Sequence, residues 1–428
     1  MIWKHFYRAR SYARSALWVV PFIAIPLELI LTRVFHGLGD WLQWTLLDFS
    51  MSGARAMFEA VVTATLTFVV FTFGSLLVAI QVASGQMTPR IIATTLLRDR
   101  LVKYTVGLFI FTLLLALSAQ DRLGTSVNQL VAFVIAILGL SSFAAFFYLI
   151  DYASRLLRPI SMLSTVGNYG LMVIEMVYPD PSVDPVPHDS QRPKIGLPDR
   201  TILHRGTSEI VLAVNVQALL AEADRASGVI EFVPQVGDFV GVDEPLFNLY
   251  GGASAIGDSV LRHTVAFGSE RTLEQDPTFA FRIVVDIALR ALSPAINDPT
   301  TAVLAIDQLH RMLRRVGKRY LRTDEILAPD GQLRVILRTP NWEDFVNLAF
   351  TEIRGCGSNN LQIVRRLRIM IENLVQTLPS HRHTALREQL SLLDREVAKH
   401  FAYPEELALA GVGDSQGLGG RSSLGSAQ

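Results

Sequence analysis

Cysteine is nearly absent from this sequence of 428 residues, in which Cys356 is the one example. A single cysteine excludes an internal disulfide framework and fits a reducing compartment for the part of the chain that carries it. An excess of either charge is also missing, because 39 Lys and Arg balance 39 Asp and Glu. A net charge of zero without a basic block argues against nucleic acid as a partner.

The motifs that identify most enzymes are missing as well. The sequence contains no Gly-x-Ser-x-Gly, no phosphate-binding loop, no His-Glu-x-x-His and no Cys/His metal spacing. His381 and His383 flank Arg382, and without further ligands nearby we interpret them as solvated. We therefore predict no catalytic residue, no metal, no cofactor and a protein that is not an enzyme.

Charged residues of both signs are scarce, at 18% of the chain, while 50% of it is hydrophobic. The mean hydropathy of +0.33 is too high for an ordinary soluble protein. The excess lies in four apolar runs near the front, and a bilayer requires about 20 apolar residues per helix. We predict a transmembrane domain over 1–160 with spans at about 16–35, 57–85, 104–119 and 130–150. No signal-peptide cleavage pattern follows the first run, so we expect it to be retained.

Basic residues are unevenly distributed around these spans. Because Lys and Arg collect on the cytoplasmic side, an even number of spans with both termini cytoplasmic is predicted. The basic residues on the predicted inner side are Lys4, Arg8, Arg10, Arg14, Arg90, Arg98, Arg100, Lys103, Arg155 and Arg158, against Arg33, Arg55 and Arg122 outside.

One face of the second span is small and polar. A helix continuing to Thr88 would be roughly 48 Å long, and a polar face must turn toward protein or water because lipid cannot satisfy it. The face is either the lining of a pore or a packing surface between helices. Steps of four and three residues place on it Glu59, Thr63, Thr67, Val70, Gly74, Leu77, Gln81, Ser84 and Thr88.

Glu28 is a second acidic group within an apolar run, beyond Pro26 in the first span. An ionisable residue at membrane depth indicates a permeation path. With the predicted orientation, Glu28 and Glu59 fall toward the outer leaflet, where acidic groups would favour cations. The alternative is that Glu28 snorkels to the interface or pairs with Arg33.

After the spans, an amphipathic helix and a Pro-rich linker over 161–198 lead to a predicted α+β cytoplasmic domain at 199–405. Residues 406–428 are rich in Gly and Ser and are predicted to be disordered. The alternating segment 228–250 resembles the barrel-sandwich of biotinyl and lipoyl domains. Those domains carry their cofactor on a lysine, and none occurs between Ile195 and Ile256. We therefore predict a small barrel-sandwich-like β module without a carrier function.

A polar corner is predicted at the start of a helix within this domain. Asp298 can cap the helix and Pro299 suits its first position. The corner is either an anion-binding or carboxylate-binding site or a structural turn. The residues assigned to it are Glu270, Arg271, Asp276, Asn297 and Asp298.

The last predicted helix, at 383–401, carries an apolar seam of Leu386, Leu390, Leu393 and Val397. A seam with this spacing is typical of a helix that packs against another helix. We interpret it as support for a homo-oligomer.

Four phrases, at 81–90, 98–100, 270–277 and 291–302, together resemble the bacterial family of predicted membrane proteins known as domain of unknown function 2254. The resemblance covers roughly residues 10–401. It implies a multi-pass inner-membrane protein with four helices and a cytoplasmic region, and it implies no agreed activity.

From the residues themselves we predict an oligomeric channel or pore-like transporter for a small ion. The second span would line it and the cytoplasmic domain would gate it, with the lipid bilayer and further copies of the chain as partners. The alternative is a membrane-anchored scaffold or sensor without transport activity.

Overall fold

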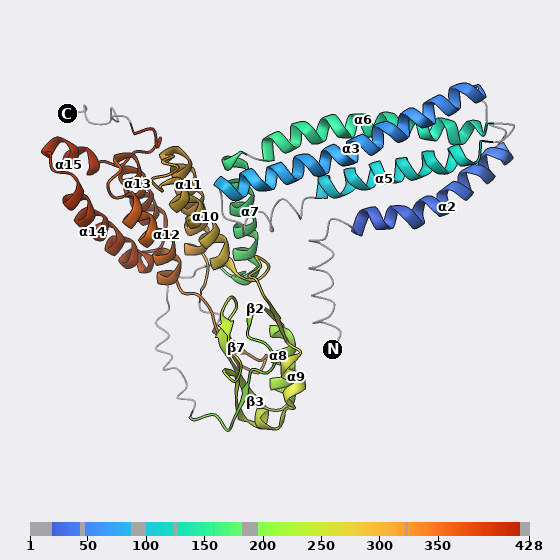
Figure 1. Cartoon of the computed structure of the whole chain (residues 1–428). Helices are drawn as coiled ribbons and strands as arrows, with labels where there is room; N and C mark the ends of the chain where they lie inside the picture. Colours follow the sequence, from blue (N-terminus) through green and yellow to red (C-terminus); the bar gives the residue numbers. More distant parts are fainter. Residues whose placement is uncertain are drawn as a thin grey trace. The chain divides into compact units, whose positions relative to one another are not determined.

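The computed structural model describes residues 19–42, 48–86, 100–123, 127–156, 158–181, 196–321 and 324–419 (Figure 1). The chain divides between Met162 and Leu163 into two compact units. We call residues 10–162 the membrane unit and the described residues from Leu163 onward the soluble unit, names that follow the sequence predictions.

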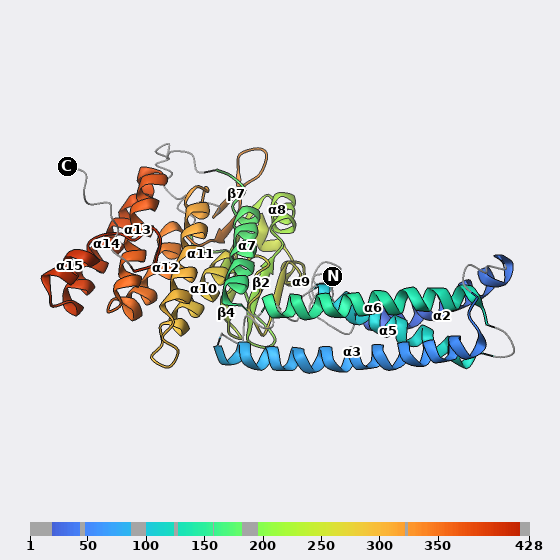
Figure 2. The same ribbon diagram turned by 90° about the horizontal axis from the view of Figure 1, so that it is seen from above.

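The membrane unit consists of long apolar helices. Its described helices are α2 (Val19–Leu42), α3 (Met51–Gln86), α5 (Arg100–Asp121) and α6 (Gln129–Leu156). Figures 1 and 2 show them side by side, with α5 in contact with the other three. Ala54 and Phe58 of α3 pack with Leu115 and Ala116 of α5 and Ile135 of α6 in one apolar core. These helices contain the four predicted spans, apart from residues 16–18, which lie outside the described part.

Among the described residues, four helical segments are long and apolar enough to cross a membrane. Three of them lie in α3, α5 and α6 and agree with the predicted second, third and fourth spans. The fourth is Ile160–Val177, within α7 (Pro159–Val177), which the sequence predicts as an amphipathic helix outside the bilayer. α2 is not among the four.

The soluble unit contains two open sheets. The larger sheet is mixed, because β3 pairs in parallel with β8 while its other neighbours are antiparallel. Neither sheet closes, so a mixed sheet domain is present and the predicted barrel-sandwich is not confirmed. In order across each sheet, the strands are β1 (Arg200–Leu203), β5 (Pro245–Gly251), β3 (Gly228–Gln235), β8 (Leu333–Arg338) and β7 (Glu325–Leu327), then β4 (Phe239–Val240), β2 (Glu209–Val214) and β6 (Val265–Gly268).

The sheets enclose a core because β3 alternates buried and partly exposed residues along its length. Ile230 and Phe232 point inward from β3, and α8 (Val216–Arg225) packs across β3 and β8 through Leu219. The short elements here are η1 (Gly252–Ala255) and α9 (Asp258–Arg262).

The rest of the soluble unit is helical. Four of its helices begin at residues whose side chains accept a backbone N–H, namely Asp276, Asp298, Asn341 and Asn360, as expected for N-caps. The helices are α10 (Pro277–Ala291), α11 (Pro299–Gly317), α12 (Trp342–Gly357), α13 (Leu361–Thr377), α14 (His383–His400) and α15 (Pro404–Ala410), with the short η2 (Ser380–Arg382).

The apolar seam of α14 faces inward, which contradicts its interpretation as an oligomer surface. Leu386, Leu393 and Val397 are buried within one chain, and Leu390 is partly buried. α14 packs against α12 and α13 with this face. A helix in a globular bundle and a helix at a subunit interface show the same apolar spacing, so the seam carries no support for assembly.

The prediction of a disordered tail is wrong for residues 406–419. This segment forms the end of α15 and then an ordered turn held against α13. Composition alone favoured disorder, and hydrogen bonds from arginine side chains overcome it. Residues 420–428 lie outside the described part.

Candidate functional site

The polar stripe of α3 faces away from the core of the membrane unit. Glu59, Thr63, Thr67, Gly74 and Gln81 are all exposed in the single chain. The packing face instead holds Ala54, Phe58, Thr65, Phe68 and Thr72. At about 100° per residue, the two sets lie on opposite sides of the helix. The side chain of Ser84 and all of Thr88 lie outside the described part.

Two threonines of the stripe already have hydrogen-bond partners on their own helix. Thr63 donates to the carbonyl of Glu59 (2.9 Å), and Thr67 donates to the carbonyl of Thr63 (2.7 Å). Gln120 of α5 donates to Glu59 Oε1 at 3.5 Å, a long contact. The threonines are therefore compatible with a dry surface, whereas Glu59 and Gln81 need a polar environment.

The interior of the membrane unit is filled by phenyl rings at the level of Phe68. Its ring centroid lies 5.5 Å from that of Phe109 in α5, and 5.0 and 4.2 Å from those of Phe143 and Phe146 in α6. Phe68 and Phe109 are buried, while Phe143 is 46% exposed, so the rings pack outward from the interior of the unit.

Glu28 lies apart from the stripe. It is 5% exposed within α2, and its Oε1 accepts a hydrogen bond from Thr32 at 2.6 Å. α2 packs against α5 and α6. The Glu28 carboxylate therefore has a hydrogen-bond donor inside the membrane unit, and it does not lie on the exposed face that carries Glu59.

The predicted polar corner is divided between two places, which corrects its grouping. Asp276 begins α10 and Asp298 begins α11, and the backbone N–H of Asp298 bonds to the carbonyl of Ala291 at the far end of α10. A helix of 15 residues is roughly 22 Å long. Asn297 and Asp298 are thus a full helix away from Asp276, Arg271 and Glu270, and the five residues form no common site.

The Asn297–Asp298 end is a structural turn. Asn297 takes a left-handed φ of 48°, which asparagine tolerates better than most residues. Asp298 accepts from the backbone of Thr301 (3.0 Å) and from its hydroxyl. Both oxygens of this carboxylate therefore have partners within the first turn of α11.

The Asp276 end differs because its carboxylate is buried, at 3% exposed. Oδ1 accepts from Phe279 N (3.0 Å) and from the Thr278 hydroxyl, while Oδ2 makes no hydrogen bond and lies 3.9 Å from Arg271 Nη1. A Cβ on Gly237, whose φ is +96°, would lie 2.5 Å from this Oδ2. Burial raises the pKa of the Asp276 carboxyl, and its hydrogen bonds and Arg271 oppose the rise only in part.

Asp276→Asn is expected to become more stable relative to the wild type as the pH rises from 4 to 7. A carboxyl whose pKa is raised on folding contributes stability below its unfolded pKa of about 3.9, and this contribution is lost as the pH rises toward the folded pKa. Asparagine caps equally well and does not titrate. Denaturant melts across this pH range measure the effect. Asp298→Asn, the same change in a partly exposed cap, is the matched control, and identical pH profiles for the two variants would contradict the prediction.

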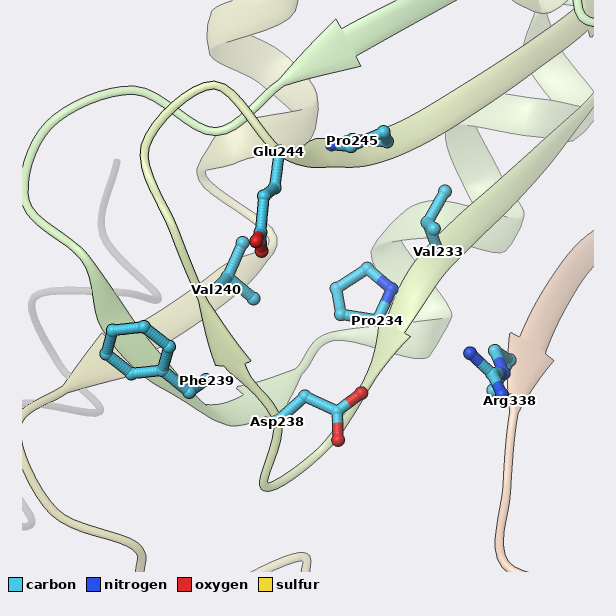
Figure 3. Close-up of a pocket in the computed structure, with 8 residues that line it drawn as sticks. All are labelled: Val233, Pro234, Asp238, Phe239, Val240, Glu244, Pro245 and Arg338. Carbon is cyan, nitrogen blue, oxygen red and sulfur yellow. The ribbon is translucent and has the colours of Figure 1, made fainter.

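An open pocket of about 420 Å³ lies at the carboxyl ends of the parallel strands β3 and β8 (Figure 3). Asp238 and Glu244 each accept a backbone N–H of their own turn at 2.8 Å. Arg338 projects from β8 on the opposite side from Phe239. The lining has no Ser, Cys, His or Lys and so offers no nucleophile; it consists of Val233, Pro234, Asp238, Phe239, Val240, Glu244, Pro245 and Arg338.

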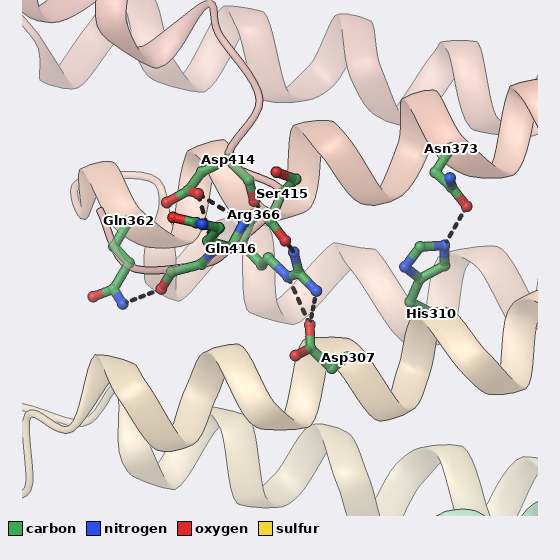
Figure 4. Close-up of polar contacts among 9 residues, drawn as sticks. Asp307, His310, Gln362, Arg366, Asn373, Asp414, Ser415 and Gln416 are labelled. Carbon is green, nitrogen blue, oxygen red and sulfur yellow. Dashed lines mark hydrogen bonds and ion pairs between the residues drawn. The ribbon is translucent and has the colours of Figure 1, made fainter. Parts of the chain in front are cut away.

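Arginines of α13 hold the C-terminal segment in place (Figure 4). Arg366 bonds to Asp307 of α11 (2.6 Å) and donates to the carbonyl of Ser415 (2.7 Å), while the wholly buried Arg365 donates to the carbonyl of Val412 (2.9 Å). Asp414 closes the turn by accepting three backbone N–H groups, from Gln416, Gly417 and Gly419, at 3.0, 2.9 and 2.7 Å.

This tail clamp, formed by Arg365, Arg366 and Asp414, is the polar site that the sequence analysis missed. Its signal was an arginine at a buried position of an amphipathic helix: Arg365 and Arg368 are three residues apart on the face of α13 that also carries Leu367 and Ile371. Buried charges require partners, so their spacing indicates that another segment covers this face.

A sequence model of the family described as "Predicted membrane protein (DUF2254)" matches residues 14–373. The chain belongs to this family. The resemblance drawn from the four sequence phrases is thereby confirmed. The family's name gives its location in a membrane and no activity, and among the described residues no group of His, Cys, Asp or Glu is placed to hold a metal ion.

Two mycobacterial proteins are similar to the chain over most of its length. An uncharacterized protein of Mycobacterium tuberculosis and one of Mycobacterium bovis are each 27% identical over 421 residues, covering 93% of this chain and 79% of the relative. No solved structure matches the chain. The family assignment rests on the family model, and the printed names of these relatives state no activity.

Proposed function

We propose that the membrane unit assembles with further copies through the exposed face of α3, and that the assembly provides a polar path for a small cation. The observation that carries this proposal is the position of the stripe, opposite the packing face of α3 and uncovered in one chain. As an integral bacterial inner-membrane protein with both termini cytoplasmic, the chain would act in transport and not as an enzyme.

The cost of leaving the stripe in lipid supports assembly. A charged residue in the membrane opposes insertion, by about 2.5–3.5 kcal/mol at the bilayer centre. Glu59 lies toward the outer end of its span and bears part of this cost, with only the long contact to Gln120 among the described residues to offset it. Contact with a second copy or with water lowers the free-energy cost of placing Glu59 in the membrane. Interhelical hydrogen bonds in membranes contribute about 0.6 kcal/mol each, so dry packing of two stripes would offset only a small part of this cost. A hydrated face recovers more, which favours a path over a seam.

Glu59 supplies the preference for cations. It is the acidic residue of the stripe, and in a symmetric assembly each copy places its Glu59 at the same depth. Rings of carboxylates select cations in other channels. Glu28, which is buried and bonded to Thr32, has no part in this arrangement.

The competing function is a membrane-anchored scaffold or sensor, in which the stripe packs against another helix. The hydrogen bonds of Thr63 and Thr67 to their own backbone favour it, because these hydroxyls need no water. Both functions require further copies or a partner on α3. They differ in whether water reaches the stripe.

Cysteine accessibility separates the two. Single cysteines at Thr63, Thr67 and Gln81, in a Cys356→Ser background and in liposomes, are expected to react with small water-soluble thiol reagents. Matched controls are cysteines at Phe71 and Phe73, which flank the stripe and are 51% and 42% exposed in one chain. We expect these to stay unreactive because they face lipid.

Unreactive stripe cysteines would contradict the polar path. Together with an absence of cation flux through the purified protein, they would leave the scaffold function standing. Equal reactivity at the stripe and at the two phenylalanine positions would instead show that no particular face of α3 is hydrated.

A further inference from the structure

Helix α7 has an inner face that packs closely on the helical part of the soluble unit. A Cβ on Gly170 would lie 2.6 Å from Met312 Sδ of α11 and 2.9 Å from the Cβ of Ala280 of α10. Glu175 pairs with Arg315 and lies 3.7 Å from Arg319. The glycine allows the close approach, and the ion pairs fix the helix in register. The inner face is therefore fully occupied.

The outer face of α7 carries three large, exposed apolar side chains, with the polar Asn168 beside them. Tyr169, Met172 and Met176 are 47%, 55% and 56% exposed, and their spacing of three and four residues puts them on one side of the helix. Glu175 is the one charged residue between Pro159 and Val177, and the ion pairs with α11 engage it. Three large apolar side chains together on a single face indicate a docking surface.

Chain continuity identifies what covers this face. α6 is long and apolar enough to span a membrane and ends at Leu156, and α7 begins at Pro159. Three residue steps reach roughly 10 Å, so the start of α7 must lie at a membrane boundary. Arg155 and Arg158, both exposed, flank the junction, and basic residues at this position attract anionic lipid headgroups.

α7 itself has the length and hydropathy of a membrane span, but its partners oppose insertion. Crossing the bilayer would carry α11 with it, since Gly167 and Gly170 contact Gln308 and Met312. α11 contains Asp307, Arg311, Arg314 and Arg315, and ionisable groups at membrane depth are costly. A helix held on one side by such a partner lies on the membrane and does not cross it.

We propose that α7 lies in the membrane interface with Tyr169, Met172 and Met176 in the boundary between lipid headgroups and acyl chains. The soluble unit then rests on the bilayer through this helix. Tyrosine is enriched at that depth because its ring is apolar and its hydroxyl is wet. Interfacial helices usually have a basic polar face of their own, opposite the apolar face. In α7 the side opposite the apolar residues packs on α10 and α11 instead.

Depth-dependent quenching in the full-length protein tests the proposal. Cysteines at Met172 or Met176, in a Cys356→Ser background, receive an environment-sensitive fluorophore, and the protein is placed in liposomes of phosphatidylcholine and phosphatidylglycerol. We expect several-fold stronger quenching by a nitroxide near the top of the acyl chain than by aqueous iodide. A label at Tyr403, which is 67% exposed at the start of α15, is the control and should show the reverse.

Three results would overturn the proposal. Strongest quenching by a nitroxide near the end of the acyl chain would show that α7 spans the bilayer. Strong iodide quenching would show that the face is in water. Protection from both quenchers, with energy transfer between differently labelled chains, would show that a second copy covers it.

A second variant guards against a merely local effect of the label. Met172→Asp places a charge on the outer face and leaves the inner contacts of α7 unchanged. With the label at Met176, we expect a several-fold loss of quenching by the shallow nitroxide and an unchanged melting temperature. Unchanged quenching would contradict the docking of this face on lipid.

Discussion

Asp414→Ala is expected to lower the free energy of unfolding of the soluble unit by about 3 kcal/mol. The variant loses the acceptor of three backbone N–H bonds at a residue that is only 5% exposed. Hydrogen bonds to a charged acceptor contribute about 1.5–3 kcal/mol each, and buried N–H donors that lose their acceptor add to the loss. For a unit of this size the melting temperature should fall by roughly 6–12 °C.

The same carboxylate makes the tail clamp sensitive to acid. Burial pushes the pKa of Asp414 upward, but the three N–H donors and Arg365 outweigh it and hold the pKa below its usual range. A lowered folded pKa stabilises above the unfolded value of about 3.9, and this stabilisation is lost as the pH falls through the folded pKa. Proteolysis of the C-terminal segment should therefore accelerate below pH 4 in the wild type and change little with pH in Asp414→Ala.

Asp394→Ala is the matched control for the tail clamp. Asp394 also pairs with an arginine of α13, Arg368, but its side chain is 53% exposed. Water screens this exposed carboxylate, and the buried Arg368 keeps its hydrogen bond to the carbonyl of Ala410 (2.9 Å), so we expect a smaller loss of stability than in Asp414→Ala. Equal destabilisation by the two variants would mean that burial of the tail clamp contributes nothing, contrary to the structure.

Local signals in the sequence predicted the helices well and the tertiary relations poorly. Asp298 caps α11 as predicted, because capping depends on a few adjacent residues. Asp276, which was assigned to the same corner, caps α10. The grouping of these two caps was wrong, since consecutive antiparallel helices begin at opposite ends. No local sequence pattern predicts that α10 and α11 pack in opposite directions.

The predictions for the α14 seam and for the C-terminal tail were wrong for a related reason. An apolar spacing such as Leu386 to Leu393 shows that a face is covered and does not show by what. A Gly-rich segment reads as disordered by composition, yet Arg365 and Arg366, about fifty residues earlier, supply its hydrogen bonds. On α3 the stripe itself was visible in the sequence, and its exposure could be learned only from where Phe58 and Phe68 pack.

Gly74→Leu is expected to reduce cation flux through the reconstituted protein to background while leaving its assembly intact. Among the described residues, no atom outside the neighbouring backbone of α3 lies within 4 Å of a Cβ at Gly74, so one copy accepts the larger side chain without a clash. Several leucines meeting at one depth of a shared path would form an apolar constriction, and such constrictions close channels by dewetting. Flux in liposomes and crosslinking in membranes measure the two properties separately.

Gly37→Leu provides the control, because a Cβ at Gly37 in α2 also meets nothing within 4 Å. Both variants add the same side chain to an open helix surface of the membrane unit, and only Gly74 lies on the stripe. Flux that survives Gly74→Leu would exclude α3 as the lining. Loss of crosslinking in Gly74→Leu, with assembly of Gly37→Leu unaffected, would instead show that the stripe is a dry helix–helix contact, since small residues there let membrane helices approach closely.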